Sequence, residues 1–212
     1  MKIDFVDLQR QNRIYKNELM GAIEHIVDKA SFIDGLELSK FENDFAAFCK
    51  KKYCVGMNSG TDALMLSLLA YGVGKGDEVI TVPNSYFSTA MVISNIGAIP
   101  VFADMDPKTY NIDVNKIEEK ITKKTKAIIP VHLYGQSADM DPIVSIAEKH
   151  NLVIIEDCCQ AHGAKYKGKS LPYTETGAFS FYPGKNLGSF GDSGAVVTNN
   201  MEIKEKLEYL RN

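Results

Sequence analysis

The chain has 212 residues, of which 45% are hydrophobic and 24% charged, a composition typical of a folded globular protein rather than a disordered or fibrous one. Its 24 Lys and Arg against 27 Asp and Glu give a formal charge of −3, which argues against non-specific binding of nucleic acid or anionic membranes. No apolar run approaches the ~18 residues that a transmembrane helix needs.

The start of the chain and its cysteines indicate the compartment. Met1-Lys2-Ile3-Asp4 carries an early acidic residue and no apolar core of a signal peptide, so we expect no export. The four cysteines show neither a CxxC pair nor a zinc-binding spacing: Cys49, Cys54, Cys158 and Cys159. The sequence therefore predicts a cytoplasmic protein with reduced thiols and no metal site.

An amphipathic segment at residues 12–29 predicts an N-terminal helix, and after it short apolar runs alternate with helical patterns. The predicted strands are residues 53–57, 78–82, 100–103, 127–131, 153–156, 178–181 and 195–198. The predicted helices are residues 61–70, 89–95, 114–121, 140–150 and 201–211. Several strands are nearly continuous apolar runs, which favours parallel strands covered on both faces. We therefore predict an α/β fold with a mainly parallel sheet sandwiched by helices, and a ligand site at the carboxyl ends of the strands.

A small polar turn, Ser59-Gly60-Thr61-Asp62, follows the first predicted strand and opens the next helix. Backbone N–H groups at a helix N-terminus lack partners inside the helix, so this turn can bind an anion such as phosphate. Ordinary capping by Ser59 or Thr61 explains the same residues without a ligand.

Residues at three further strand ends fit either a ligand site or an ordinary structural role. Tyr86 can cover a flat ligand or pack in the core. Asp157 ends an apolar strand, where a buried carboxylate needs a structural hydrogen bond or a cationic ligand atom. Lys185 lies in a Pro-Gly turn and is either a solvated charge or a Schiff-base nucleophile.

These four features together match the requirements of a pyridoxal phosphate site. The helix N-terminus would take the phosphate, and the aromatic side chain would cover the ring. The carboxylate would keep a proton on the ring nitrogen, and the lysine would form an imine.

Four separated motifs carry a family resemblance. In chain order they are Ser59-Gly60-Thr61-Asp62-Ala63-Leu64, Pro130-Val131-His132-Leu133-Tyr134-Gly135, Glu156-Asp157 with Gln160-Ala161-His162-Gly163-Ala164, and Ser180-Phe181-Tyr182-Pro183-Gly184-Lys185-Asn186-Leu187-Gly188. The chain resembles the DegT/DnrJ/EryC1/StrS family of pyridoxal-phosphate-dependent nucleotide-sugar aminotransferases, which have the aspartate-aminotransferase-like (type I) fold. The resemblance extends from the loop at residues 32–35 to the end of the chain.

The resemblance implies roles around the cofactor ring that agree with those derived from the residues. Lys185 would bind the cofactor covalently and then shuttle protons. Asp157 would pair with the pyridine nitrogen. Gln160 would lie near the ring hydroxyl, and Tyr86 would stack on the ring.

The resemblance also assigns the phosphate and substrate contacts. Ser180 would hold the cofactor phosphate together with the turn formed by Gly60, Thr61 and Asp62. Tyr182 would approach the sugar of the substrate.

The implied reaction moves an amino group from glutamate to a nucleoside-diphosphate keto-sugar. Lys185 favours transamination over the sugar dehydratases of the family, which lack this lysine. Gln160 and the turn at residues 183–188 favour amination at the 3-keto position. A 4-keto-sugar aminotransferase of the perosamine type, and a non-catalytic remnant that binds only cofactor or a partner, remain the alternatives.

The resemblance further implies a homodimer with no bound metal, nucleic acid or membrane. Family members continue past the point where this sequence stops, into a C-terminal domain that contributes to the site. We therefore expect residues 1–212 to form the large cofactor-binding domain, with an N-terminal helical segment at about residues 1–50 and no small domain. On this expectation the chain alone is poorly active.

Overall fold

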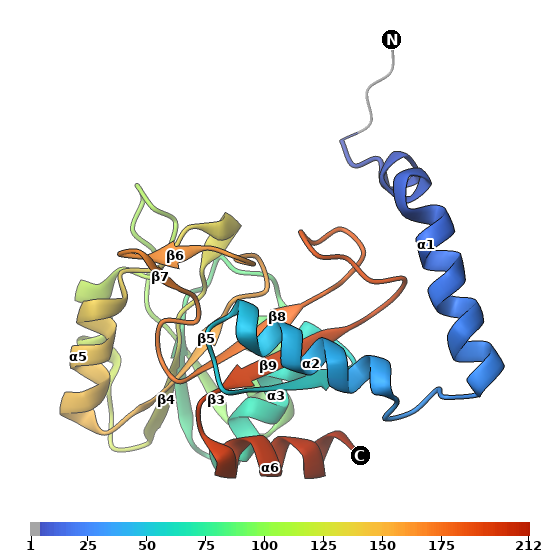
Figure 1. Ribbon diagram of the computed structural model, residues 1–212. Helices are drawn as coiled ribbons and strands as arrows, with labels where there is room; N and C mark the ends of the chain where they lie inside the picture. Colours follow the sequence, from blue (N-terminus) through green and yellow to red (C-terminus); the bar gives the residue numbers. More distant parts are fainter. Residues whose placement is uncertain (1–4) are drawn as a thin grey trace.

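The computed structural model describes residues 5–212 (Figure 1). The predicted absence of a signal peptide rested on Met1–Asp4, which lie outside the described residues. Two helices come first, α1 (Leu8–Lys29) and α2 (Leu36–Phe48). Helix α1 begins at Leu8, four residues before the predicted start, and is capped by Asp7, whose carboxylate accepts a hydrogen bond from the Arg10 backbone N–H. Among residues 5–212, no helix is both long and apolar enough to span a bilayer.

A seven-stranded sheet forms the centre of the molecule, with strand order β1-β9-β8-β5-β4-β2-β3. The strand pairs β2–β3, β2–β4, β4–β5 and β5–β8 are parallel, and β9 runs antiparallel to both of its neighbours. The mainly parallel sheet is therefore confirmed. The strands are β1 (Tyr53–Met57), β2 (Glu78–Thr81), β3 (Ile99–Phe102), β4 (Thr125–Ile129), β5 (Val153–Asp157), β8 (Thr176–Ser180) and β9 (Gly194–Thr198).

Helices cover both faces of this sheet (Figure 1). Helices α3 (Gly60–Ala70), α4 (Ser88–Asn95) and α6 (Met201–Arg211) contribute to one apolar cluster, whereas α2 and α5 (Met140–His150) contribute to the other. Neighbouring strand residues such as Ile128 and Ile129 belong to opposite clusters, because successive side chains of a strand point to opposite faces. This two-sided burial explains the continuous apolar runs in the sequence.

The predicted helix at residues 114–121 is wrong. The segment forms two short 3₁₀ turns, η1 (Val114–Lys116) and η2 (Glu118–Lys120), on either side of the fully buried Ile117. Its backbone bonds join each residue to the third one before it, as in Lys120 to Ile117. The tighter turns place Ile117 in the core before the chain enters β4 at Thr125.

A small hairpin, absent from the predicted elements, joins β6 (Lys165–Tyr166) to β7 (Lys169–Ser170). Lys167 and Gly168 form its two-residue turn, and both have positive φ angles, 47° and 81°. A two-residue turn with this backbone matches the right-handed twist of the flanking strands.

Candidate active site

One cavity of about 350 Å³ lies at the carboxyl-terminal edge of the sheet. Its walls come from the segments that follow β1, β2, β5 and β8, four strands that point the same way. The carboxyl ends of such strands meet at one edge of a sheet, which is the usual ligand position in α/β folds. The lining residues are Ser59, Gly60, Thr61, Leu64, Ser85, Tyr86, Ser88, Thr89, Asp157, Cys159, Gln160, Ser180, Tyr182, Lys185 and Asp192.

The structure brings eight of the nine residues singled out in the sequence into this cavity: Gly60, Thr61, Tyr86, Asp157, Gln160, Ser180, Tyr182 and Lys185. Asp62 is not among the lining residues. Its backbone N–H donates a 3.0 Å hydrogen bond to the Ser59 hydroxyl.

The start of helix α3 forms one wall of the cavity. Ser59 caps the helix through its hydroxyl and its carbonyl, which accept the backbone N–H groups of Asp62 and Ala63. Within the described part of the chain, the N–H groups of Gly60 and Thr61 are left without a hydrogen-bond partner. Such groups, at the positive end of the helix dipole, suit an anionic ligand group.

At Gly60 and Gly194 the backbone of this wall lies so close to its neighbours that a side chain would not fit. A Cβ atom added to Gly60 would lie 2.6 Å from the Ser180 Cβ and 2.8 Å from the Cys159 Sγ. A Cβ added to Gly194 would collide with the backbone of Ser59. The Ser180 hydroxyl oxygen accepts the Tyr182 backbone N–H at 3.3 Å, which leaves the hydroxyl proton to be donated elsewhere.

Asp157 is buried, with 4% of its surface exposed, at the end of β5. Its two carboxylate oxygens accept hydrogen bonds from the Thr89 hydroxyl at 2.8 Å and from the Cys159 backbone N–H at 3.1 Å. A buried carboxylate is costly unless it is hydrogen-bonded, and these two donors meet that requirement. The remaining lone pairs of Asp157 can accept a donor from a ligand in the cavity.

Lys185 and Gln160 lie on loops, and each loop is held by a hydrogen bond to a nearby backbone group. The backbone N–H of Lys185 donates to the Tyr182 carbonyl at 2.8 Å, which closes the turn that presents the lysine. The Gln160 side-chain oxygen accepts the Tyr134 backbone N–H at 3.0 Å, so the amide NH₂ of Gln160 is the end left to donate. Tyr86 and Tyr182 are both exposed, which leaves their rings available to a ligand.

Five polar cavity residues were missed by sequence reasoning: Ser85, Ser88, Thr89, Cys159 and Asp192. All but Asp192 lie close to predicted residues at the same strand ends, which was the available signal. Burial, reinforced by the nearby Asp157 charge, raises the pKa of the Cys159 thiol well above its usual range, so the neutral thiol is favoured near neutral pH.

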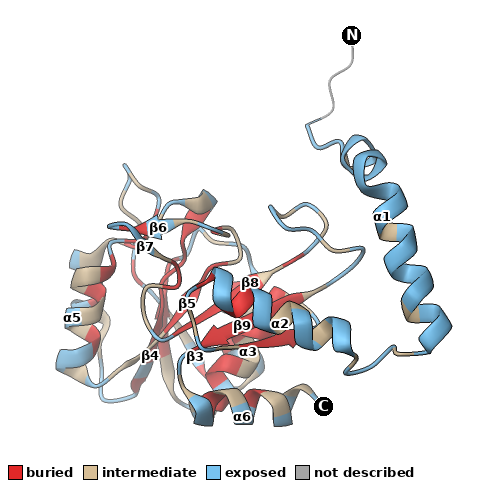
Figure 2. Ribbon diagram, viewed as in Figure 1, coloured by how far each residue is buried: buried red, intermediate tan, exposed pale blue. Residues whose placement is uncertain are grey.

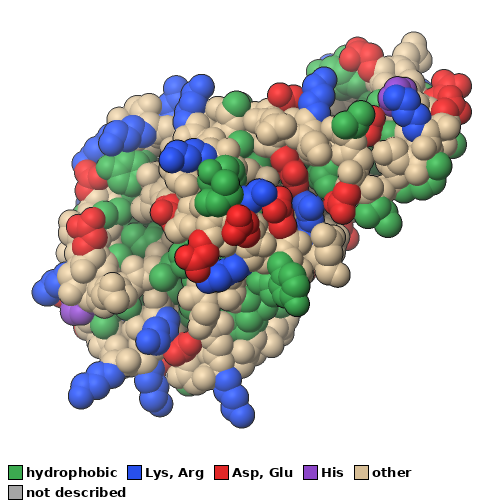
Figure 3. Space-filling view, turned by 60° about the horizontal axis from the view of Figure 1, so that its bottom comes forward, with side chains coloured by type: hydrophobic (Ala, Val, Ile, Leu, Met, Phe, Trp, Pro, Cys, Tyr) green, Lys and Arg blue, Asp and Glu red, His purple; other side chains and the backbone are tan. Residues whose placement is uncertain are grey.

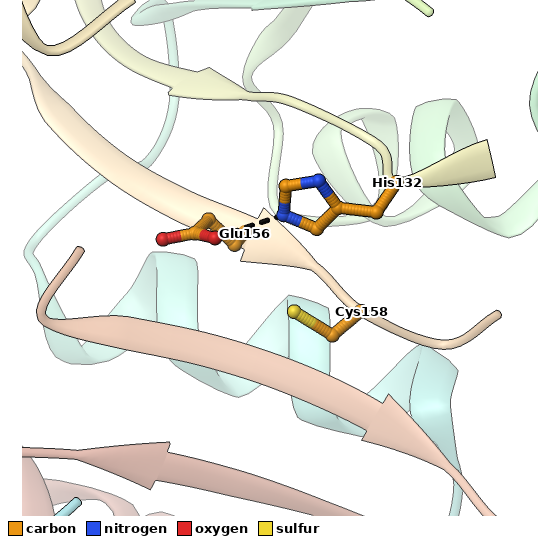
Figure 4. Close-up of side chains that lie close together, drawn as sticks. All are labelled: His132, Glu156 and Cys158. Carbon is orange, nitrogen blue, oxygen red and sulfur yellow. Dashed lines mark hydrogen bonds and ion pairs between the residues drawn. The ribbon is translucent and has the colours of Figure 1, made fainter. Parts of the chain in front are cut away.

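A second group of polar side chains, His132, Glu156 and Cys158, has its potential ligand atoms within 4.8 Å of one another (Figure 4). The Ala138 backbone N–H donates to His132 Nδ1 at 3.1 Å, so His132 Nε2 carries the proton and donates to Glu156 at 2.8 Å. Burial raises the pKa of the Cys158 thiol well above its usual range. Because internal hydrogen bonds use the imidazole nitrogens and a metal ligand must be deprotonated, we interpret this group as structural.

The fold and the cavity define an α/β protein whose strand ends gather a helix N-terminus, a buried carboxylate and a lysine around one small-molecule site. Residues 13–212 match the DegT/DnrJ/EryC1/StrS aminotransferase family, and the chain belongs to this family. The resemblance found in the sequence is thereby confirmed. The fold is the type I fold of these aminotransferases.

Individual relatives are similar over nearly the whole chain. The dTDP-3-amino-3,6-dideoxy-alpha-D-galactopyranose transaminase of Aneurinibacillus thermoaerophilus is 51% identical over 99% of this chain and 58% of its own length. A "pleiotropic regulatory protein" of Geobacillus stearothermophilus is 47% identical over 100% and 57%. The crystal structure of S. venezuelae DesV with a ketimine intermediate superposes with a TM-score of 0.97 at 44% identity, covering 100% of this chain and 57% of DesV. The chain thus spans somewhat more than half the length of these relatives.

Proposed function

We propose that this chain is the cofactor-binding part of a pyridoxal-phosphate-dependent aminotransferase that acts on a nucleotide-linked keto-sugar. One observation carries the proposal: Lys185, Asp157 and the N-terminus of α3 line a single cavity, although they come from three separate segments of the chain. Membership of the aminotransferase family supports the same conclusion.

The residues around the cavity fit pyridoxal phosphate. The N–H groups of Gly60 and Thr61 and the hydroxyl proton of Ser180 are donors suited to the phosphate. The missing side chain of Gly60 lets the start of α3 lie close to Ser180, so that these donors come together. Asp157 is a buried acceptor suited to a protonated ring nitrogen. The volume of about 350 Å³ lies within the range of small-molecule sites.

When bound, pyridoxal phosphate acts as an electron sink that makes the α-proton of an amino acid acidic. The Lys185 amine would hold the cofactor at its carbonyl, and its Nζ atom would be the group that moves the proton. The Asp157 carboxylate would hold a proton on the ring nitrogen and so maintain the electron demand of the ring. The Gln160 amide would donate to the ring hydroxyl, and Tyr86 would cover one face of the ring.

For the substrates, we propose glutamate as the amino donor and a nucleoside-diphosphate keto-deoxysugar, aminated at the 3-keto position, as the acceptor. The 51% identical relative that is named for a 3-amino sugar supports this position. Tyr182, exposed at the cavity, is proposed to contact the sugar.

A spectroscopic experiment tests the proposed function. Mixed with pyridoxal phosphate, the chain is expected to develop the near-visible absorbance of a lysine-bound cofactor, and this band should change when glutamate is added. Lys185→Ala should abolish the band, because it removes the amine that binds the cofactor. The exposed Lys108, which is not a cavity residue, provides the matched control Lys108→Ala. A band that survives Lys185→Ala, or no band with the unaltered chain, would contradict the proposal; the second result would favour a regulatory or binding role.

We further propose that the protein acts in the cytoplasm as a homodimer. Helix α1 has no buried residue and exposes apolar side chains that a second copy can cover (Figure 2): Ile14, Tyr15, Met20, Ile23 and Val27.

A further inference from the structure

A chain of hydroxyl groups leads to Asp157 from the first turn of α4 and the loop before it. The Ser85 and Thr89 hydroxyl oxygens lie 2.9 Å apart, and the Thr89 hydroxyl lies 2.8 Å from Asp157 Oδ2. Thr89 is 2% exposed and Asp157 4% exposed, so the bond between them is shielded from solvent.

The direction of these hydrogen bonds follows from the chemistry of the groups. An ionised carboxylate only accepts hydrogen bonds, so the Thr89 hydroxyl donates its single proton to Asp157. Thr89 can then only accept from Ser85, whose hydroxyl is therefore the donor. The order Ser85 to Thr89 to Asp157 directs two aligned hydroxyl dipoles at the carboxylate.

The position of Thr89 strengthens this effect. It is the second residue of α4, so it lies at the positive end of the dipole of that helix. The other carboxylate oxygen is held by the Cys159 backbone N–H at 3.1 Å. Thr89 and Cys159 thus hold the Asp157 carboxylate from both oxygens and fix its rotation.

We propose that Thr89 is a positioning residue: its hydroxyl holds the Asp157 carboxylate in the orientation in which it can accept a hydrogen bond from the protonated ring nitrogen of the cofactor. Ser85 supports Thr89 from the cavity side. This inference rests on the proposed function, because it assigns the partner of Asp157 to the pyridine ring.

The test uses pyridoxamine phosphate labelled with ¹⁵N in the ring, because this form binds without a covalent bond to Lys185. The ¹⁵N resonance of the bound ring reports directly whether the nitrogen carries a proton. Thr89→Val keeps the volume of the buried side chain and removes the hydroxyl. Thr89→Ser keeps the hydroxyl, and Ser85→Ala removes only the outer donor.

We expect the bound ring nitrogen to be protonated in the unaltered chain and in Thr89→Ser. In Thr89→Val the resonance should move toward the unprotonated position, and the affinity for pyridoxamine phosphate should fall about tenfold or more, which corresponds to roughly 1.4 kcal/mol. Ser85→Ala should give a smaller shift in the same direction. A Thr89→Val variant that is folded by circular dichroism but has an unchanged ¹⁵N resonance would overturn the inference and leave the proposed function standing. If the unaltered chain fails to bind the labelled compound, both are overturned.

Discussion

Gly60 shows how one residue can decide whether a site exists. The glycine opens α3, and a Cβ atom there would meet the Ser180 Cβ at 2.6 Å and the Cys159 Sγ at 2.8 Å. Both distances are too short for ordinary contacts, so a larger residue would push the turn at Ser59 away from β8. The same turn presents the N–H groups proposed to bind the phosphate.

We therefore expect Gly60→Ala to weaken binding of pyridoxamine phosphate about tenfold, roughly 1.4 kcal/mol, through displacement of the phosphate donors. Fluorescence titration of the chain with the cofactor measures this loss. Gly74→Ala is the matched control, because a Cβ atom at Gly74 meets nothing within 4 Å and should leave binding unchanged. Equal affinities of the two variants would show that the turn at Gly60 does not hold the phosphate.

The contacts of Ser59 show how the turn at the start of α3 can both cap the helix and bind an anion. The turn was consistent with ordinary helix capping or with an anion site, and the hydroxyl of Ser59 does cap α3 by accepting the Asp62 N–H. Capping uses only the N–H groups of Asp62 and Ala63, so those of Gly60 and Thr61 stay available to a ligand. The two interpretations are therefore compatible.

At the scale of elements, α1 differs from every other α-helix of the described chain because none of its residues is buried. It projects from the body as a separate arm (Figures 1 and 3). A helix without tertiary packing is marginally stable in water, since most helical stability in proteins comes from a buried face.

We expect the backbone amides of α1 to exchange with solvent much faster than those of β8 and β9 in dilute protein, because opening α1 exposes no core. If a second copy covers α1, its protection should increase with protein concentration while that of β8 stays constant. Hydrogen–deuterium exchange at several concentrations measures both effects. Protection of α1 equal to that of the sheet at the lowest concentration would contradict this account.

The arrangement of β8 and β9 also determines where Lys185 lies. The sequence placed it in a turn after a strand, and the structure shows that the turn belongs to a long connection between β8 and the antiparallel β9. Gly194 begins β9 directly against the backbone of Ser59, so this connection returns beside the start of α3. That return brings the lysine turn and the α3 N-terminus to the same cavity.

At the scale of the whole molecule, Glu156 at β5 forms hydrogen bonds with two other parts of the chain. Its carboxylate is fully buried and accepts hydrogen bonds from His132, which follows β4, and from Tyr173 and Thr174, which precede β8. Burial by itself raises the pKa of Glu156, but the hydrogen bonds from His132 and Thr174 outweigh it, so the pKa is lowered from its ordinary value of 4.5.

A carboxylate whose pKa is lower in the folded state adds stability above its unfolded pKa and loses it as the pH falls through the folded value. We therefore expect Glu156→Gln to reduce the free energy of unfolding at pH 7 by about 2 kcal/mol. This difference from the unaltered chain should shrink as the pH falls below 4.5. Urea unfolding across this range measures it. Glu205→Gln, on the exposed surface of α6, should change little at either pH. A constant difference at all pH values would exclude the carboxylate as its source.

The amino-acid pattern by itself predicted the class of fold and most of the residues that the structure brings to one cavity. Continuous apolar runs of four to five residues, bounded by polar turns, are enough to identify buried parallel strands, and ligands of such sheets bind at the strand ends. The local motifs around Gly60, Asp157 and Lys185 then indicated the chemistry. Local sequence could do this because capping, strand burial and turn formation depend on near neighbours.

Only the tertiary structure decided which groups meet. Thr89 reads in sequence as an ordinary first-turn helix residue, and its bond to Asp157 joins positions 68 residues apart. The buried His132–Glu156 pair and the break of the predicted helix at Ile117 likewise depend on packing between distant segments. Such contacts are set by the three-dimensional path of the chain, so no local pattern specifies them.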